Sequence, residues 1–337
     1  MNFSDISKVR GSTYRTTLLI SCPEEGKSPR RLACGEMHIP LVAFVGKRPG
    51  KTLYIQAAQH AEYQGSGAIK NLIEGLDPEK MCGSVILVPI TDTILARKWR
   101  AVKDPENPFT RDNMHEYWPG RKHGTLKERA VSVLFQDWMK YANAFVDLHS
   151  WYGASVPSVL VDESDDRSVK LAQKSGYPVV SLTPNIGSQR LLGGTYQRVP
   201  KEGIPGFCME ANHDWKFGGY LRKEMMDLME RSLRNVMKVL GILPGKCDYP
   251  KERYVVDMQE ELPEANFAGL LVPEVPLGTL VERGARVAGI YEPGTFQLIQ
   301  EISTRKGGLY FGTFPGSMVK KGDWAALIKT HVRVLAS

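Results

Sequence analysis

The sequence predicts an α/β protein with a mixed, mainly parallel sheet flanked by helices, plus a small C-terminal β-barrel. Apolar runs of strand length alternate with helical patterns as far as residue 240, which is the order of elements in an open α/β sheet. Beyond residue 250 the pattern changes to short strands separated by turns. We therefore expect two domains, at residues 1–245 and 251–337.

The individual elements follow from apolar periodicity and from the turn residues between the runs. Two early runs lie among turn residues and are expected to be lead-in strands at one edge of the sheet. The predicted strands lie at 17–20, 39–45, 53–59, 85–88, 145–148, 159–161 and 179–180, and the helices at 67–75, 127–139, 168–174 and 219–240. The polar segments 91–124 and 187–201 are predicted to be loops, the first of them a lid over a site.

Composition limits the class of protein. The chain has 42% hydrophobic and 24% charged residues, which is ordinary for a soluble globular protein. Its net charge of +7 is scattered and predicts no nucleic-acid partner, although a mild positive field can attract anionic substrates. The five cysteines show no C-x-x-C pair, and neither a signal peptide nor an apolar run of about 20 residues is visible. We expect a cytoplasmic protein without a membrane partner.

The apolar run that begins at Leu53 is followed by polar side chains that can bind a metal ion. His60 and Glu62 lie two residues apart after this run, and side chains at i and i+2 of an extended segment point the same way. An imidazole and a carboxylate so placed suit a zinc ion. The alternative is a buried histidine that is hydrogen-bonded to a neighbouring carboxylate.

A second apolar run ends in Asp147 and His149, 87 residues beyond Glu62. Two near ligands and one remote histidine match catalytic zinc, where a fourth position is left for water and the metal lowers the pKa of that water. Asp147 can orient the His149 ring from behind or simply terminate the strand as a turn carboxylate. A third run ends in Glu210, which is either a general base or a surface carboxylate.

These segments together resemble the succinylglutamate desuccinylase and aspartoacylase family, relatives of the zinc carboxypeptidases. The motifs that carry the resemblance lie at 39–40, 49–53, 60–65, 83–89, 118–120, 147–150 and 203–210. The resemblance implies a carboxypeptidase-like zinc hydrolase domain at 1–245, with one Zn²⁺ per chain held by His60, Glu62 and His149. It also implies that Glu210 is the general base and that Arg100, or Arg97 in its place, polarises the scissile carbonyl.

Two segments depart from the family pattern. The family's first two ligands are usually spaced H-x-x-E, whereas His60 and Glu62 are spaced H-x-E. An ungapped alignment puts Gln59, a poor zinc ligand, at the histidine position. We prefer the gapped alignment, because it keeps His60 and Glu62 as ligands.

The second departure replaces a carboxylate-binding Asn-Arg pair of the family with His115 and Glu116. This change inverts the local charge and weakens recognition of an α-carboxylate at these positions. Asn113 and Arg111 can bind the carboxylate instead. We expect Asn113, His115 and Glu116 to contact substrate. Alternatively, in place of carboxylate recognition by Asn113 and Arg111, Glu116 faces a substrate amine, as in an N-acyl diamino acid or another cationic amide. The alternative is that the pair is only loop surface.

The C-terminal domain resembles the small barrel of biotinyl and lipoyl carrier domains. The lysine that such carriers modify in a hairpin is absent from a convincing position, so a structural or gating role is expected.

The predicted function is zinc-dependent hydrolysis of an amide, releasing an acyl group from a small-molecule N-acyl amino acid or related N-acyl amine. Homo-oligomerisation is left open. Two alternatives stand beside this function: a zinc carboxypeptidase acting on small peptides, and a non-catalytic binding protein with a decayed metal site.

Overall fold

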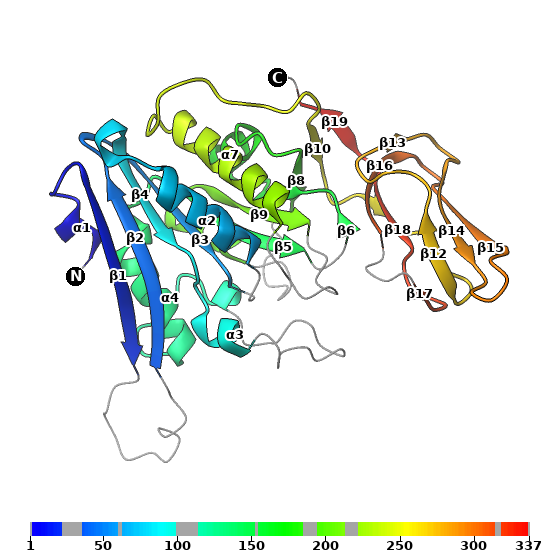
Figure 1. The fold of residues 1–337 in the computed structure, drawn as a ribbon, viewed down its shortest axis with the longest axis horizontal. Helices are drawn as coiled ribbons and strands as arrows, with labels where there is room; N and C mark the ends of the chain where they lie inside the picture. The colour runs from blue at the N-terminus through cyan, green and yellow to red at the C-terminus, as the bar shows by residue number, and fades with distance from the viewer. Residues whose placement is uncertain are drawn as a thin grey trace, which may run out of the picture.

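A ten-stranded sheet forms the body of the protein (Figure 1). The structure is a computed structural model that describes residues 2–21, 36–59, 63–98, 114–151, 154–184, 194–212, 222–313 and 318–335. In spatial order the strands are β1 (Ser12–Ser21), β2 (Glu36–Val45), β4 (Cys82–Val88), β3 (Arg48–Ala57), β5 (Ala144–Trp151), β9 (Gly206–Asn212), β7 (Ser158–Asp162), β8 (Val179–Thr183), β10 (Tyr254–Val256) and β19 (Val332–Val334).

The predicted mixed sheet is confirmed. The parallel neighbours are β4 and β3, β3 and β5, β5 and β9, β7 and β8, and β8 and β10. The other four neighbouring pairs are antiparallel. Because β3, β5 and β9 run in one direction side by side, their carboxyl ends meet at the same edge of the sheet.

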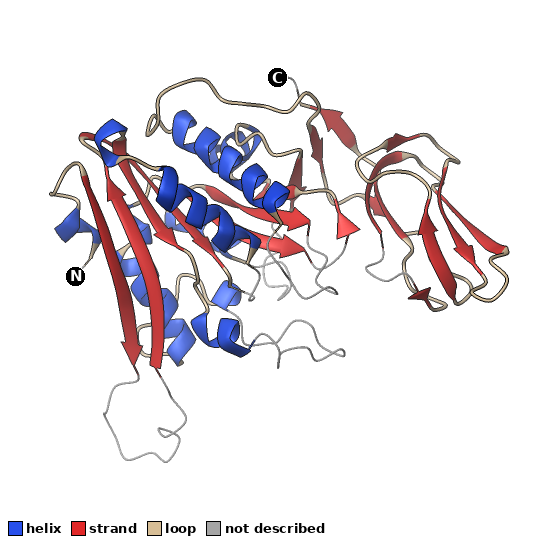
Figure 2. Cartoon of the chain, in the orientation of Figure 1, coloured by secondary structure: helices blue, strands red, loops and turns tan. Residues whose placement is uncertain are grey.

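Helices cover both faces of the sheet (Figure 2). On one face α2 (Gln64–Gly75), α5 (Asp166–Gln173) and α7 (Lys223–Val239) share a core cluster, and α2 packs on α7. On the other face α1 (Phe3–Ile6), α4 (Leu126–Asp137) and α6 (Thr195–Arg198) contribute to a second cluster. Within the described part of the chain, no helix is long and apolar enough to cross a membrane.

Helix α4 shows how local sequence fixes an element. Thr125 and Glu128 form a reciprocal capping box at its start, which satisfies two main-chain donors that the first turn leaves unpaired. Its apolar residues Ala130, Val131 and Leu134 recur at helical spacing and are fully buried.

The C-terminal strands form two separate sheets, so the predicted closed barrel is not confirmed. One sheet orders β11 (Glu260–Glu261), β18 (Ala326–Lys329), β16 (Gly308–Thr313) and β13 (Leu280–Val281), and β6 (Ala154–Ser155) also pairs with β16. The other orders β15 (Leu298–Ser303), β14 (Arg286–Tyr291), β12 (Gly269–Pro273) and β17 (Met318–Val319). Between them lies a core of their own, which includes Leu271, Ile290 and Tyr310.

Each part of the chain contributes strands to a sheet of the other part. β10 and β19 lie beyond residue 250 but extend the ten-stranded sheet, whereas β6 belongs to the first part of the chain and pairs with β16 of the five-stranded sheet. A further apolar cluster that includes Val256 and Phe311 lies where they meet. The C-terminal module is therefore attached through main-chain pairing as well as side-chain packing.

Candidate functional site

The candidate site is built on the carboxyl ends of β5 and β9. The two strands pair in parallel with Asp147 opposite Cys208 and His149 opposite Glu210. Side chains two residues apart on a strand point to the same face, and Phe145 and Cys208 place that face in the cluster that α4 and α6 cover. The four polar side chains therefore share one edge and one face of the sheet.

Asp147 and His149 form a buried ion pair. His149 Nε2 lies 2.9 Å from Asp147 Oδ2, and the two side chains are 2% and 0% exposed. Burial raises the pKa of Asp147, but the attraction of His149 and contacts with both nearby imidazoles outweigh it, so the pKa lies well below its usual range. Burial lowers the pKa of His149, but Asp147 and Cys208 raise it well above the ordinary value.

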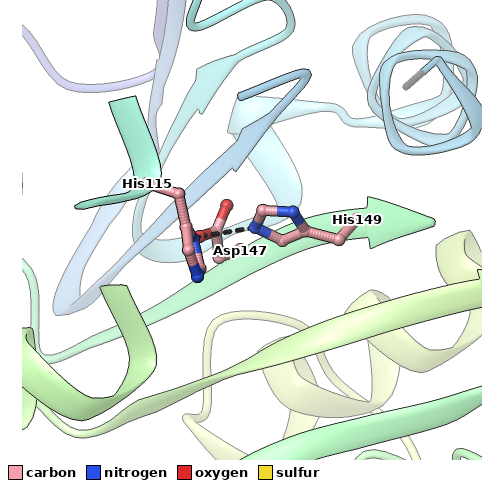
Figure 3. A group of neighbouring side chains, drawn as sticks. All are labelled: His115, Asp147 and His149. Carbon is pink, nitrogen blue, oxygen red and sulfur yellow. Dashed lines mark ion pairs between the residues drawn. The ribbon is translucent and has the colours of Figure 1, made fainter. Parts of the chain in front are cut away.

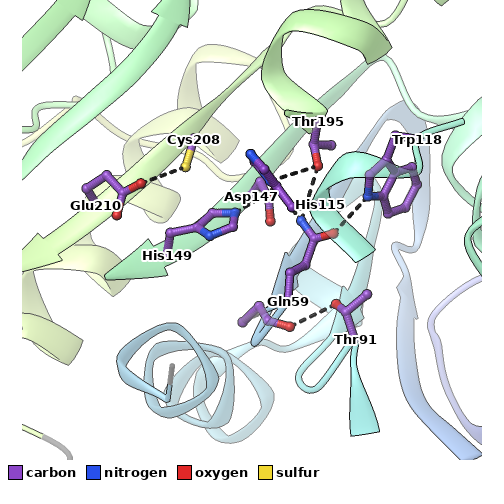
Figure 4. Close-up of polar contacts among 10 residues, drawn as sticks. Gln59, Thr91, His115, Trp118, Asp147, His149, Thr195, Cys208 and Glu210 are labelled. Atoms are coloured by element: carbon purple, nitrogen blue, oxygen red, sulfur yellow. Dashed lines mark hydrogen bonds and ion pairs between the residues drawn. The ribbon is translucent and has the colours of Figure 1, made fainter. Parts of the chain in front are cut away.

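Gln59 is the hub of the hydrogen bonds around Asp147 (Figure 4). Its Nε2 donates to Asp147 Oδ2 at 2.6 Å and to Thr195 Oγ1 at 3.1 Å, and its Oε1 accepts from Trp118 Nε1 at 2.8 Å. The side chain is fully buried. A buried amide whose oxygen and nitrogen are both hydrogen-bonded avoids the cost of unpaired polar groups and is held rigidly. This network therefore holds the Asp147 carboxylate in place.

A backbone turn at Ala58 brings Gln59 into the site. Ala58 has φ of 58°, in the left-handed region that disfavours residues with a Cβ. The turn is held by Thr91 N, which donates to Ala57 O at 2.9 Å, and by Asp92 N, which donates to Ala58 O at 3.1 Å. The segment that follows β4 thus holds the backbone turn at the end of β3.

His115 lies against His149. It belongs to a short 3-10 helix (Met114–Glu116), and its ring centroid is 4.7 Å from that of His149 with the planes at 76°. Its Nδ1 is 3.6 Å from Asp147 Oδ2 and 3.4 Å from Thr195 Oγ1. A Cβ added at Gly194 would overlap this ring, so the glycine provides the space that the ring fills.

Two groups of side chains have donor atoms close enough to share one cation. They are His115, Asp147 and His149, and His149, Cys208 and Glu210, with the atoms of each group within 4.8 Å of one another. Imidazole, carboxylate and thiol donors are those that zinc takes in proteins. The donor chemistry of the described residues therefore fits a zinc ion.

The structure places two of the predicted site residues, His115 and Glu210, each in a group with His149, and Glu116 follows His115 in the same short helix. The predicted His60, Glu62, Arg100 and Asn113 lie outside the described residues. Arg97 belongs to α3 (Thr93–Lys98).

Sequence reasoning gave no role to Trp118, Thr195 and Cys208. The position of Cys208 could have been predicted, because it precedes Glu210 by two residues and so lies on the same face of the strand. Trp118 was noted only as part of a motif, and Thr195 had no signal, since both reach the site through contacts between distant segments.

Solved structures share this fold. A succinylglutamate desuccinylase from Silicibacter sp. TM1040 superposes with a TM-score of 0.73 at 23% identity, covering 96% of this chain and 95% of that one. The product-bound ectoine utilization protein EutE (DoeB) from Ruegeria pomeroyi gives 0.72 at 22% identity, covering 96% of each chain. A curated relative, the N-alpha-acetyl-L-2,4-diaminobutyric acid deacetylase of Halomonas elongata, is 26% identical over 318 residues, 90% of this chain and 89% of that one.

The large mixed sheet is the fold of these solved structures, and the chain is similar over most of its length to a curated deacetylase, so its class is that of the α/β deacylases. Residues 49–240 match the profile of the succinylglutamate desuccinylase/aspartoacylase catalytic domain. The match spans more than half of the chain, and the protein belongs to this family. The resemblance predicted from the sequence is confirmed.

Proposed function

We propose that this protein is a zinc-dependent deacylase that hydrolyses the amide bond of an N-acyl amino acid or a related N-acyl amine. The observation that carries the proposal is the pairing of His149 with Glu210 across β5 and β9, with Asp147 2.9 Å from the His149 ring. This arrangement puts an imidazole and a carboxylate side by side at the edge of the sheet, which supports a metal-binding role for His149 and a role as base for Glu210. The sequence adds His60 and Glu62 as the expected further ligands.

Three residues of the site have a defined task in this chemistry: Asp147, Cys208 and Glu210. Asp147 fixes the orientation of the His149 ring, as carboxylates do for metal-binding histidines. A divalent metal held here would acidify water and polarise the scissile carbonyl. Glu210 takes the proton from the attacking water and delivers it to the leaving nitrogen. Cys208 Sγ donates to Glu210 Oε1 at 3.5 Å, which helps to hold that carboxylate in position.

We further propose an N-acyl diamino acid as the substrate. Glu116 is partly buried and follows His115 in the short helix, and a carboxylate that contacts the substrate would favour one that carries an ammonium group. The curated relative acts on a substrate of this kind, an N-acetylated diaminobutyric acid. In this proposal Asn113 contacts the substrate carboxylate and Arg100 stabilises the oxyanion.

Metal analysis and a matched pair of substrates test the proposal. We expect about one zinc per chain and turnover of N-α-acetyl-L-2,4-diaminobutyrate well above that of N-acetyl-L-2-aminobutyrate, which lacks the second amine. Glu116→Gln should reduce this preference and leave turnover of the neutral substrate unchanged. Absence of both zinc and turnover would favour a binding protein instead, and cleavage of dipeptides alone would favour a carboxypeptidase.

A further inference from the structure

A buried ion pair joins helix α4 to the segment that follows β4. Lys127 Nζ lies 2.8 Å from Asp92 Oδ2, and the two side chains are 9% and 0% exposed. We propose that Lys127 and Asp92 are positioning residues of the candidate site, which fix the backbone turn at the end of β3. The inference rests on the proposed function, because it adds two residues to the support of the same site.

Asp92 contacts three segments through three different groups. Its main-chain N donates to Ala58 O at 3.1 Å, its Oδ1 accepts from Leu95 N at 2.8 Å, and its Oδ2 pairs with Lys127. The first contact holds the end of β3, the second caps α3, and the third reaches the first turn of α4. This one buried residue therefore fixes how the three segments lie relative to one another.

Neighbouring contacts hold the same turn. Thr91 N and Thr91 Oγ1 donate to Ala57 O at 2.9 and 2.8 Å (Figure 4). In the first turn of α2, Ser66 Oγ donates to Pro89 O at 2.6 Å. The segment between β4 and α3 is therefore bonded both to the end of β3 and to the start of α2.

The turn that Asp92 holds carries Gln59 into the site. Gln59 Nε2 donates to Asp147 Oδ2 at 2.6 Å, and Asp147 is paired with His149 (Figure 3). The expected ligand His60 follows Gln59 directly in the sequence. Because misplacing a reacting group by about 1 Å can cost about 10²-fold in rate, a contact that fixes this turn affects the chemistry without touching substrate.

A buried ion pair is a poor way to gain stability. Removing two charges from water costs about as much as their attraction returns, and apolar side chains of similar volume often stabilise a fold equally well. The contacts of Asp92 are directional instead, since one carboxylate oxygen meets Lys127 while the other accepts from Leu95 N. This geometry favours a role in fixing position.

Steady-state kinetics of the full-length protein with an N-acetyl diamino acid test the inference. The double variant Asp92→Asn/Lys127→Met removes both charges and keeps an acceptor for Leu95 N. We expect its kcat to fall by about 10–100-fold with little change in KM, because the catalytic groups and not the substrate contacts are displaced. Its thermal unfolding temperature should stay close to that of wild type.

Lys47→Met is the matched control. Lys47 Nζ lies 3.1 Å from Glu79 Oε2, but these side chains are 59% and 56% exposed. The variant removes an ion pair of the same chemistry at the surface, and it should keep the wild-type kcat and KM.

Hydrogen–deuterium exchange gives a readout that does not depend on activity. The main-chain N–H groups of Thr91 and Asp92 donate to the end of β3. In the double variant, a peptide that covers residues 89–96 should exchange faster than in wild type, while peptides from the C-terminal sheets exchange as before. If the double variant does not fold, Asp92→Asn alone is read in the same two ways, since it keeps the acceptor for Leu95 N but sets an amide against Lys127.

The outcomes separate this inference from the proposed function. A lower kcat at unchanged KM, with faster exchange in residues 89–96 only, supports the inference. A wild-type kcat in the variants, or faster exchange throughout the protein, overturns it and leaves the proposed function standing. A wild-type protein without deacylase activity overturns the proposed function, and the exchange of residues 89–96 then decides whether the pair fixes the turn.

Discussion

Two buried carboxylates, one in each part of the molecule, are held in different ways. Asp147 at the sheet edge is fully buried, and its Oδ2 contacts Gln59 and His149, while its Oδ1 has no hydrogen-bond partner among the described residues. Glu261 in the C-terminal module is 6% exposed, and both of its oxygens accept main-chain N–H groups. Arg305 N donates at 2.9 and 3.0 Å and Lys306 N at 3.2 Å.

The difference separates a structural carboxylate from one suited to a site. The donors to Glu261 come from one turn, and they include Thr304 Oγ1 at 3.0 Å and Arg305 Nε at 3.1 Å. They saturate the carboxylate and leave no direction for a ligand. The partners of Asp147 are side chains from several distant segments, and its Oδ1 has none among the residues that the structure describes. Satisfied backbone donors stabilise a fold, whereas an incompletely paired buried carboxylate points to a further partner.

The largest expected effect concerns Glu210, the partly buried carboxylate at the same edge as Asp147. Glu210→Gln should lower kcat by about 10²–10⁴-fold, because the proton acceptor is lost. Steady-state kinetics with an N-acetyl diamino acid and elemental analysis check this, and zinc content should stay at the wild-type level. A kcat within a few-fold of wild type would remove Glu210 from the mechanism.

Asp147→Asn comes next. A loss of at least about 10–100-fold in metal affinity or kcat/KM is expected, since the carboxylate that holds His149 is gone. Chelator competition and kinetics measure it. Glu261→Gln is the control, and equal effects of the two variants on kcat/KM would abolish the distinction between the carboxylates.

Glu261→Gln should act on stability alone. Replacing the charged acceptor weakens bonds from the 304–306 turn, and a cost of about 1–3 kcal/mol in the free energy of unfolding follows. Urea unfolding measures the cost, and activity at saturating substrate should match wild type. Unchanged stability would mean that the turn holds without this charge.

The stability difference between wild type and Glu261→Gln should depend on pH. Burial raises the pKa of Glu261, but hydrogen bonds from the Arg305 backbone and side chain outweigh it, so the folded pKa lies below the ordinary value. The contribution is therefore fully present above the unfolded pKa of about 4.3 and is lost as pH falls through the lowered folded pKa. The unfolding free energies of wild type and Glu261→Gln should therefore converge as the pH is lowered from about 7 to about 3. A difference that grows with acid would contradict the assignment.

The smallest effect is expected at Ala58, which turns Gln59 toward Asp147. Glycine relieves about 1 kcal/mol of left-handed strain but adds a similar entropy to the unfolded chain. Ala58→Gly should therefore change the free energy of unfolding by less than about 1 kcal/mol. Thermal unfolding tests this, and a loss above about 2 kcal/mol would mean that the methyl group, not the turn, is what matters.

The strand-end part of the site was predictable and the rest was not. Asp147, His149 and Glu210 stand where apolar runs end, and period-two spacing places them on one face. Gln59 was considered only as an alternative alignment, and its contacts with Trp118 and Thr195 join segments 59 and 136 residues apart. No local pattern encodes such pairings.

The same limit applies to the fold. The strands of the large sheet follow from hydrophobic runs, and their existence was predicted. The C-terminal strands were predicted too, but whether they close into a barrel depends on which edges meet, and β10 and β19 join the other sheet instead. Edge pairing is decided by tertiary contacts that a linear pattern does not contain.

The position of β19 has a consequence for biosynthesis. β10 pairs with β8 on one side and with β19 on the other, and the whole C-terminal module lies between β10 and β19 in the chain. While a ribosome makes that module, the outer edge of β10 is exposed, and exposed edges invite pairing with other chains. β19 therefore covers this edge of β10 only after the module has been made, and chains that stop before β19 would be prone to associate through the edge.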